Sequence, residues 1–124
     1  MGRRLLLTSL ALAALALVAC GGEDTDPRVR AVDKGDATLI DVRTRREWDG
    51  GHAKHAVLLP HEDVKRGARP DVAKDRTVLV YCRSGRRAAE VATILERDGW
   101  TDVRAIGGLK DWEQAGGELA PTAG

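Results

Sequence analysis

The sequence predicts a small α/β domain in which helices cover both faces of a parallel sheet. Two observations lead to this fold class: short apolar runs alternate with helical patterns along the chain, and polar or glycine-rich residues bound each run. Fully buried strands read as continuous apolar runs, and strands that alternate with helices favour right-handed crossovers in a parallel sheet. The length of 124 residues favours one domain of this kind.

Four apolar runs are the predicted strands. They are residues 38–42 (TLIDV), 56–60 (AVLLP), 77–82 (TVLVYC) and 103–106 (VRAI). In parallel sheets of this type, ligands bind beyond the carboxyl ends of the strands, where loops meet the first turns of helices. The run 77–82 is the most continuous of the four, and it ends at Cys82. We therefore expect a ligand site at that end of the sheet.

Three segments between the strands have helical patterns. Residues 44–51 (TRREWDGG) begin with Thr44 and have Glu47 three positions later, which is the pattern of a capping box, followed by glycines that end a helix. Residues 86–100 place apolar side chains on one face and stop near Gly99. Residues 109–117 (LKDWEQAGG) form a third short pattern with a glycine end.

The amino-terminal segment does not belong to this domain. It has two basic residues at positions 3 and 4, an apolar run over 5–18 and small residues ahead of Cys20, which is the layout of an export signal. Its end, LVACG, resembles the bacterial lipoprotein signal, in which the cysteine becomes lipidated. We expect a signal peptide at 1–19, a lipidated Cys20 with a tether over 20–27, and the folded domain at 28–124. An uncleaved signal anchor is the alternative.

Charge and cysteine usage restrict the partners. Lysine and arginine number 20 and aspartate and glutamate 19, so no strong net field predicts a nucleic-acid partner. The expected membrane contact is the lipid on Cys20, which would hold the domain on the extracytoplasmic side of a bacterial membrane, periplasmic or at the cell surface. If that cysteine is lipidated, Cys82 has no cysteine with which to pair. A free thiol in an oxidising compartment is a liability unless it is buried or used.

The segment CRSGRR, residues 82–87, is the candidate site. A loop from a strand to a helix can turn its backbone N–H groups toward one centre, and Gly85 permits a tight turn there. The sulfur of Cys82 would lie at the bottom of this anion cradle, facing the positive end of the next helix. The site therefore favours a thiolate. The alternative is a buried structural cysteine, which the adjacent glycine and three arginines make the weaker interpretation.

Three segments together resemble the rhodanese family of sulfurtransferases. Residues 39–53 (LIDVRTRREWDGGHA) look like the first signature of that family, residues 80–88 (VYCRSGRRA) look like its active-site loop, and residues 103–119 (VRAIGGLKDWEQAGGEL) look like its closing segment. They occur in the family's order and span most of the predicted domain. The resemblance implies a rhodanese-like fold, with a parallel sheet between helices.

The resemblance also implies a reaction. The thiolate of Cys82 would take the outer sulfur of thiosulfate or a similar small anionic donor, and a thiol or cyanide would then remove it from the persulfide. The persulfide would be held by the backbone N–H groups of residues 83–87, which are Arg83, Ser84, Gly85, Arg86 and Arg87. Arg83 and Arg86 or Arg87 would attract the donor. No metal or organic cofactor is implied.

Three other functions remain as alternatives. The domain could be a relay module that receives sulfur from a partner protein and turns over small donors slowly, or an inactive interaction domain, which the intact cysteine argues against. A phosphatase with the pattern Cys-x5-Arg would need an arginine at position 88, where this chain has Ala88. The loop therefore has the shorter length that accompanies sulfur chemistry in the family.

Several other residues are candidates for supporting or structural roles. Asp41 and Arg43 end the first strand at the same edge, where an ion pair is a simpler interpretation than catalysis, and Glu47 is expected to pair with Thr44 or Arg43. The three histidines, 52, 55 and 61, lack the spacing of a metal site. Ala53, Lys54 and His55 replace the apolar residue, proline and glycine that usually follow Gly-His in the family, so this turn departs from the pattern.

Overall fold

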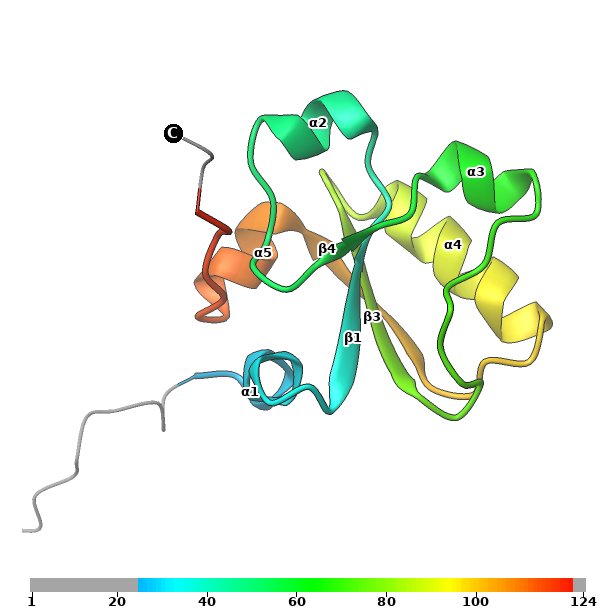
Figure 1. The fold of residues 1–124 in the computed structure, drawn as a ribbon, viewed down its shortest axis with the longest axis horizontal. Helices are drawn as coiled ribbons and strands as arrows, with labels where there is room; N and C mark the ends of the chain where they lie inside the picture. Colours follow the sequence, from blue (N-terminus) through cyan, green and yellow to red (C-terminus); the bar gives the residue numbers. More distant parts are fainter. Residues whose placement is uncertain (1–24, 122–124) are drawn as a thin grey trace, which may run out of the picture.

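The computed structural model describes residues 25–121, which form four parallel strands and five helices (Figure 1). The strands are β1 (Ala37–Asp41), β2 (Val57–Leu58), β3 (Thr77–Cys82) and β4 (Val103–Gly108). The helices are α1 (Pro27–Asp33), α2 (Arg45–Asp49), α3 (His61–Lys65), α4 (Arg86–Arg97) and α5 (Leu109–Gln114). The predicted signal peptide and Cys20 lie outside the described residues.

The sheet has the strand order β2-β1-β3-β4, and every pair is parallel. This arrangement confirms the predicted fold class. All four strands end toward the same edge, above which α2 lies in Figure 1. Between β3 and β4 the register shifts after Val80, so that Cys82 pairs with Gly108. The last residue of β3 therefore lies directly beside the last residue of β4.

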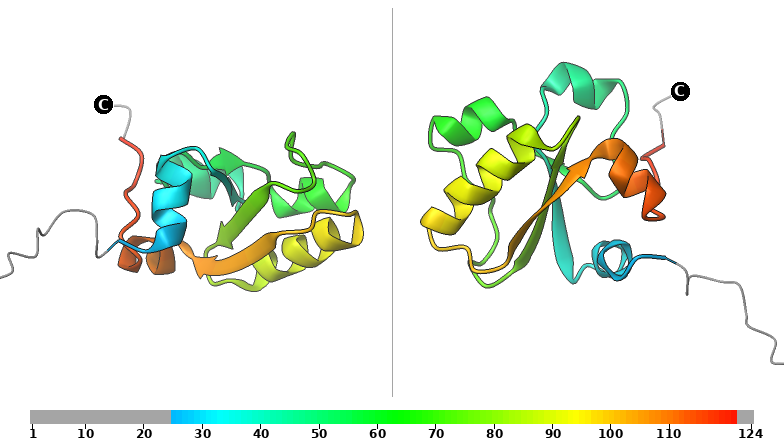
Figure 2. Two further views of the ribbon diagram at one scale, coloured as in Figure 1. Left: turned by 90° about the horizontal axis from the view of Figure 1, so that it is seen from below. Right: turned by 180° about the vertical axis from the view of Figure 1, so that it is seen from behind.

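Helices cover both faces of the sheet, as Figures 1 and 2 show. On one face, α3 and α4 bury Val64, Val91 and Leu95 against side chains from β1 and β3. On the other face, α1 and α5 bury Val29, Val32 and Trp112 against the alternate side chains of the same strands. Because successive residues of a strand point to opposite faces, the continuous apolar runs supply both cores.

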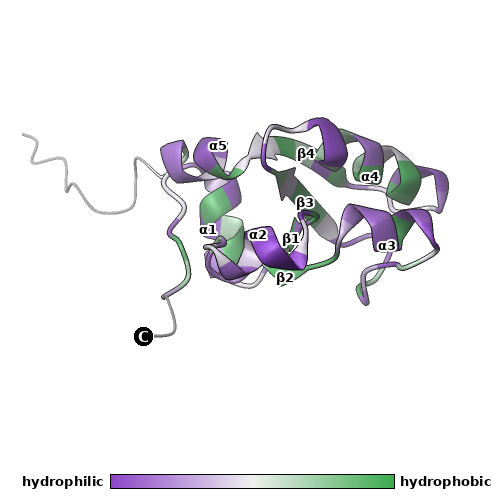
Figure 3. Cartoon of the chain, turned by 90° about the horizontal axis from the view of Figure 1, so that it is seen from above, coloured by the Kyte–Doolittle hydropathy of each residue, from purple (hydrophilic) through white to green (hydrophobic). Residues whose placement is uncertain are grey.

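The helix α2 differs from the others because it buries no residue. Its predicted capping box is present: the side chain of Thr44 accepts from the backbone of Glu47, and the side chain of Glu47 accepts from the backbone of Thr44. Figure 3, which views the molecule from above, shows α2 as a mostly hydrophilic ribbon in front of the strands. Local capping and contacts at the sheet edge therefore hold α2, rather than a core-facing stripe.

Two helices were not expected from the sequence. The helix α1 begins at Pro27, the last residue of the predicted tether, with Asp26 as its N-cap. The helix α3 follows Pro60, so the predicted strand 56–60 contracts to the two residues of β2. In the opposite direction, β4 runs two residues beyond its predicted end and includes both glycines at 107 and 108.

The departure from the family pattern at 53–55 has a backbone consequence. His55 has a φ of 67°, and it is the one non-glycine residue with positive φ among residues 25–121. This left-handed conformation costs a residue with a β-carbon about 1–2 kcal/mol. A histidine thus stands where a glycine would be unstrained.

Over the same described range, none of the helices is long and apolar enough to cross a membrane.

Candidate active site

The site begins where β3 ends and α4 starts. Three residues join β3 to α4, and Gly85, the last of them, is the N-cap of α4 with a φ of 104°. That left-handed conformation curls the loop back over the strand end, and its N–H donates a hydrogen bond of 3.0 Å to the Sγ of Cys82. The predicted contact between the thiol and the loop is therefore made by Gly85. Within residues 25–121, the N–H of Gly85 is the loop group that donates a hydrogen bond to Sγ.

The end of β4 forms a wall behind this loop. A β-carbon on Gly108 would overlap the carbonyl group of Arg83, and one on Gly85 would lie 3.3 Å from the Cα of Gly107. The N–H of Gly108 also donates to the carboxylate of Asp111 at 2.7 Å, which ties the start of α5 to the same place. The loop can reach its position because the facing residues carry no side chains.

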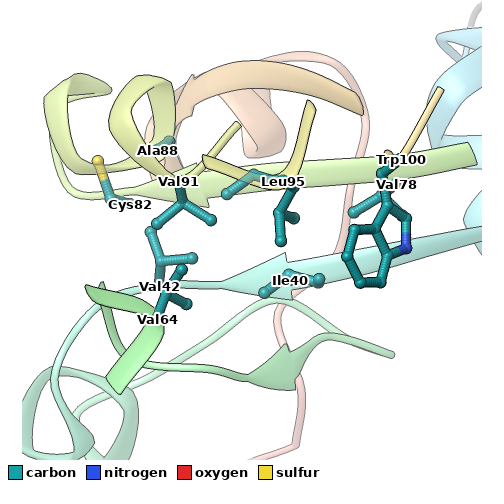
Figure 4. Close-up of a cluster of buried hydrophobic side chains, with 10 residues drawn as sticks. Ile40, Val42, Val64, Val78, Cys82, Ala88, Val91, Leu95 and Trp100 are labelled. Atoms are coloured by element: carbon teal, nitrogen blue, oxygen red, sulfur yellow. The ribbon is translucent and has the colours of Figure 1, made fainter. Parts of the chain in front are cut away.

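Cys82 itself is buried, with an exposed fraction of 0%. It lies at one end of the core cluster that includes Val42, Ala88 and Val91, and Figure 4 shows its sulfur pointing into the curl of the loop. It forms no disulfide among the described residues. Access to the sulfur therefore requires the loop to move, and this burial is a feature that the alternative interpretation of a structural cysteine also expects.

The three arginines of the loop have different environments. Arg83 and Arg86 are exposed and form no ion pair within residues 25–121. The side chain of Ser84 between them is also exposed. Arg87 is instead half-buried and donates to both carboxylate oxygens of Glu47, from Nη1 at 2.8 Å and from Nη2 at 3.0 Å. This pair connects α4 to α2 across 40 positions of sequence.

The pair between Arg87 and Glu47 also determines local charge. Hydrogen bonding to Arg87 lowers the pKa of Glu47 from 4.5 to about 2. The same contact raises the pKa of Arg87, and the nearby charges of Cys82 and Asp41 act in the same direction. Arg87 thus lies within the electrostatic reach of the cysteine, but its guanidinium is already occupied by a carboxylate.

Asp41 and Arg43 form a buried structural pair. The Nη2 of Arg43 lies 2.8 Å from the Oδ2 of Asp41 and also donates to the carbonyl of Gly51 at 2.7 Å. The hydroxyl of Tyr81 donates to Asp41 at 2.6 Å and accepts from the N–H of Ala53 at 3.0 Å. Burial, followed by the bond to Asp41, raises the pKa of Tyr81.

This network joins the end of β1 to the turn before β2. It agrees with the ion-pair interpretation made from the sequence, and Glu47 pairs with Thr44 as expected. The bond from Arg87 to Glu47 was missed, because no local spacing connects the two residues. At position 88 the side chain is Ala88, which is fully buried in the core and so lies away from the mouth of the loop.

The histidines occupy separate environments. His52 stacks on Trp48 with ring centroids 3.5 Å apart, and its Nδ1 lies 3.1 Å from the carbonyl oxygen of Ala53. His61 is buried, and its Nε2 lies 2.6 Å from Glu90 of α4. Among the described residues, no group of three or more metal-ligating side chains comes together.

A cleft of about 670 Å³ opens beside the loop. It is lined by residues that follow the carboxyl ends of three strands: Arg43 after β1, Arg83 and Ser84 after β3, and Leu109, Lys110 and Glu113 in α5 after β4. Arg83 and Ser84 therefore belong both to the loop over Cys82 and to the wall of the cleft. The structure places an open space for a ligand at the edge of the sheet where the sequence predicts one.

Comparison with known proteins finds a matching family, similar sequences and similar solved structures. The family model described as the rhodanese-like domain matches residues 29–115. The chain is 40% identical over 75 residues to the thiosulfate sulfurtransferase PspE of Escherichia coli, which covers 58% of this chain and 70% of that protein. It is 33% identical over 88 residues to a sulfurtransferase of Allochromatium vinosum, covering 70% of this chain and 81% of that one.

A longer relative and two solved structures extend the comparison. The probable adenylyltransferase/sulfurtransferase MoeZ of Mycobacterium tuberculosis is 37% identical over 76 residues, which are 60% of this chain but 19% of that protein. A Rhodanese_3-like domain from Anabaena has a TM-score of 0.61 at 29% identity, covering 68% of this chain and 99% of that one. A structure described as rhodanese with anions, from Escherichia coli, has a TM-score of 0.56 at 38% identity, with coverages of 60% and 89%.

Proposed function

This chain belongs to the rhodanese-like family of sulfurtransferases, and from that membership we propose that Cys82 carries sulfane sulfur from an anionic donor to an acceptor. The observation that carries the proposal is the hydrogen bond from the N–H of Gly85 to the Sγ of Cys82 at 3.0 Å. It supports the proposal because it joins the sulfur to the N-cap of α4, within a loop whose other N–H groups we propose to stabilise negative charge.

The proposed reaction has two balanced steps. The thiolate of Cys82 attacks the outer sulfur of thiosulfate, a new S–S bond forms, and the original S–S bond breaks with its electron pair leaving on sulfite. Cyanide or a thiolate then attacks the outer sulfur of the persulfide, and the electron pair returns to the sulfur of Cys82. The products are thiocyanate or an acceptor persulfide. Sulfite leaves before the acceptor reacts with the persulfide, so ping-pong kinetics are expected.

The exposed arginines suit the first step. Arg83 and Arg86 form no ion pair among the described residues, so both charges can attract a dianionic donor, although the charge of Arg86 also acts on Glu90. Arg87 has the different role of holding α2 against α4 through Glu47. The similar rhodanese structure from Escherichia coli is described as containing anions, which supports the proposal that this domain binds an anion.

A protein-to-protein relay is the second candidate, and the burial of Cys82 favours it. A sulfur atom with no exposed surface is reached slowly by a free donor, whereas a docked partner can hold the loop in a displaced position. The chain matches about one fifth of the length of MoeZ, so a similar domain occurs within a longer protein, which also supports a relay between proteins or domains. The two candidates differ in the donor and not in the role of Cys82.

Turnover measurements distinguish these candidates. We expect the parent protein to release sulfite from thiosulfate and to form thiocyanate when cyanide is added, and a Cys82→Ser variant to do neither. Loading from a persulfidated sulfurtransferase, with negligible turnover of thiosulfate, supports the relay. A Cys82→Ser variant that keeps the parent's rate contradicts both, because each needs this sulfur atom.

The location of the reaction is a separate proposal. The segment LVACG and the basic and apolar residues ahead of it support export and lipidation at Cys20. The domain would then act on the extracytoplasmic side of a bacterial membrane, held there by its lipid.

A further inference from the structure

The cleft beside the loop carries charges of both signs. Of its six lining residues, Arg43 is neutralised by Asp41 and also donates a hydrogen bond to the carbonyl of Gly51. The remaining charged groups are Arg83, Lys110 and Glu113, all of which are exposed and form no ion pair within the described residues. These three charged groups are free to bind a ligand.

The positions of these groups place the cleft next to the reacting sulfur. Cys82 pairs with Gly108 across the strands, and Leu109 and Lys110 follow Gly108 directly. Neighbouring strands lie about 4.8 Å apart, so Gly108, the N-cap of α5, lies about one strand spacing from Cys82. A persulfide extends the side chain by one S–S bond of about 2.05 Å, and Arg83 and Ser84 of the loop around the sulfur also line the cleft.

The side of the cleft that α5 forms does not suit a small inorganic dianion. Glu113 would repel such a donor, Leu109 offers an apolar surface, and a volume of about 670 Å³ is in the range of organic ligand pockets. Lys110 and Glu113 are three positions apart and so lie on one side of α5. A carboxylate near Arg83 and Lys110, with an ammonium near Glu113, would satisfy every free charge.

We propose that this cleft binds the sulfur acceptor and selects an organic thiol that carries both an ammonium and a carboxylate group. Lys110 and Arg83 bind the carboxylate, and Glu113 binds the ammonium. The proposal rests on the function proposed above, and it adds the substrate class of the second step. The bound thiolate attacks the outer sulfur of the Cys82 persulfide, the S–S bond to Cys82 breaks, and the acceptor leaves as a persulfide.

The test uses four small thiols that carry different charged groups. L-cysteine has both, 3-mercaptopropionate has the carboxylate, cysteamine has the ammonium, and 2-mercaptoethanol has neither. The full domain is loaded with thiosulfate, its persulfide content is measured by intact mass, and the first-turnover transfer rate to each thiol is recorded. The ratio of variant to parent is taken for each thiol, which cancels differences in intrinsic thiol reactivity.

Each variant has its own expected pattern. Lys110→Met should slow transfer to L-cysteine and 3-mercaptopropionate about five- to tenfold, which is the effect of losing one charge-assisted contact, and should change the other two rates less than twofold. Glu113→Gln should slow L-cysteine and cysteamine by a similar factor and spare the other two. Lys34→Met and Glu96→Gln, exposed residues away from the cleft, serve as controls with no preference among thiols.

The pattern across thiols decides the proposal. Equal effects on all four thiols, or none, overturn the assignment of the cleft while leaving sulfur transfer by Cys82 intact. Failure of the parent to load sulfur from thiosulfate and also from a persulfidated sulfurtransferase contradicts the proposed function itself. The two failures are observed at different steps, loading and transfer, and are therefore distinguishable.

Discussion

Gly108 lies so close to Arg83 that a β-carbon on Gly108 would overlap the carbonyl group of Arg83. The atoms that a β-carbon would meet belong to the backbone of Arg83, so no side-chain rotation can relieve the overlap. The glycine pair at the end of β4 therefore sets the position of the loop that holds the cysteine sulfur. This relationship makes the loop position a property of a neighbouring strand rather than of the loop alone.

A Gly108→Ala variant should transfer sulfur much more slowly and should remain folded with a moderate loss of stability. The displaced loop would carry the N–H of Gly85 away from Sγ, and we expect loading from thiosulfate to slow at least about tenfold, with a stability loss of about 1–3 kcal/mol for the overpacking. Loading kinetics and denaturant unfolding measure the two effects. Gly50→Ala is the control, because its β-carbon would meet ordinary contacts at 3.4 Å. Loading at the parent's rate in Gly108→Ala would show that the wall is unnecessary.

The pair between Glu47 and Arg87 should make stability depend on pH in a defined range. Because the pKa of Glu47 falls from 4.5 to about 2 on folding, its contribution is complete above about pH 4.5 and disappears as the pH drops toward 2. We expect Glu47→Gln to lower the unfolding free energy by about 1–2 kcal/mol at pH 7, since both side chains are mostly shielded from solvent.

Denaturant unfolding of the parent and Glu47→Gln from pH 7 to pH 2.5 checks this expectation. The difference between the two proteins should shrink as the pH falls. Asp49→Asn is the matched control, because its pair with Arg45 is 76% and 62% exposed and should contribute little. A difference that stays constant down to pH 2.5 is incompatible with a charge-based contribution.

Replacing His55 by glycine should stabilise the fold. The φ of 67° is strained for histidine and unstrained for glycine, and after the added flexibility of the unfolded chain we expect a gain of about 0.5–1 kcal/mol. Thermal or urea unfolding measures it. His55→Ala keeps the β-carbon and should show no gain, which separates backbone strain from loss of the imidazole. Equal effects of glycine and alanine would refute the strain explanation.

Sequence patterns predicted the parts of this fold that depend on local signals. The run ending at Cys82, the capping box of Thr44 and Glu47, and the amphipathic α4 each depend on residues close in sequence. The helix α1 was missed although Asp26 and Pro27 are start signals, because seven residues beside a polar segment resemble a linker. The edge strand β2 was overestimated, because Pro60 ends it.

The parts of the site that sequence could not predict depend on distant contacts. The bond from Arg87 to Glu47 spans 40 residues, and it turns one expected donor-binding arginine into a link between helices. The full burial of Cys82 follows from packing against Val42 and Ala88. The cleft with Lys110 and Glu113 exists only because α5 begins beside the end of β3.

Lipidation at Cys20 can be tested apart from the chemistry. In bacterial cells supplied with labelled palmitate, the parent should incorporate label and sediment with membranes, whereas Cys20→Ser should do neither, because the thiol is the acylation site. Cys82→Ser is the control and should retain both properties. Label that persists in Cys20→Ser would contradict the proposed anchor.

The central claim is that Cys82 holds a transferable sulfur within the loop made by Gly85. Intact-mass analysis after incubation with thiosulfate tests it most directly. We predict that the parent gains the mass of one sulfur atom, that added cyanide removes it, and that Cys82→Ser gains none. A parent mass that stays unchanged with thiosulfate and with persulfidated protein donors, or a Cys82→Ser variant that gains sulfur equally, would contradict the account.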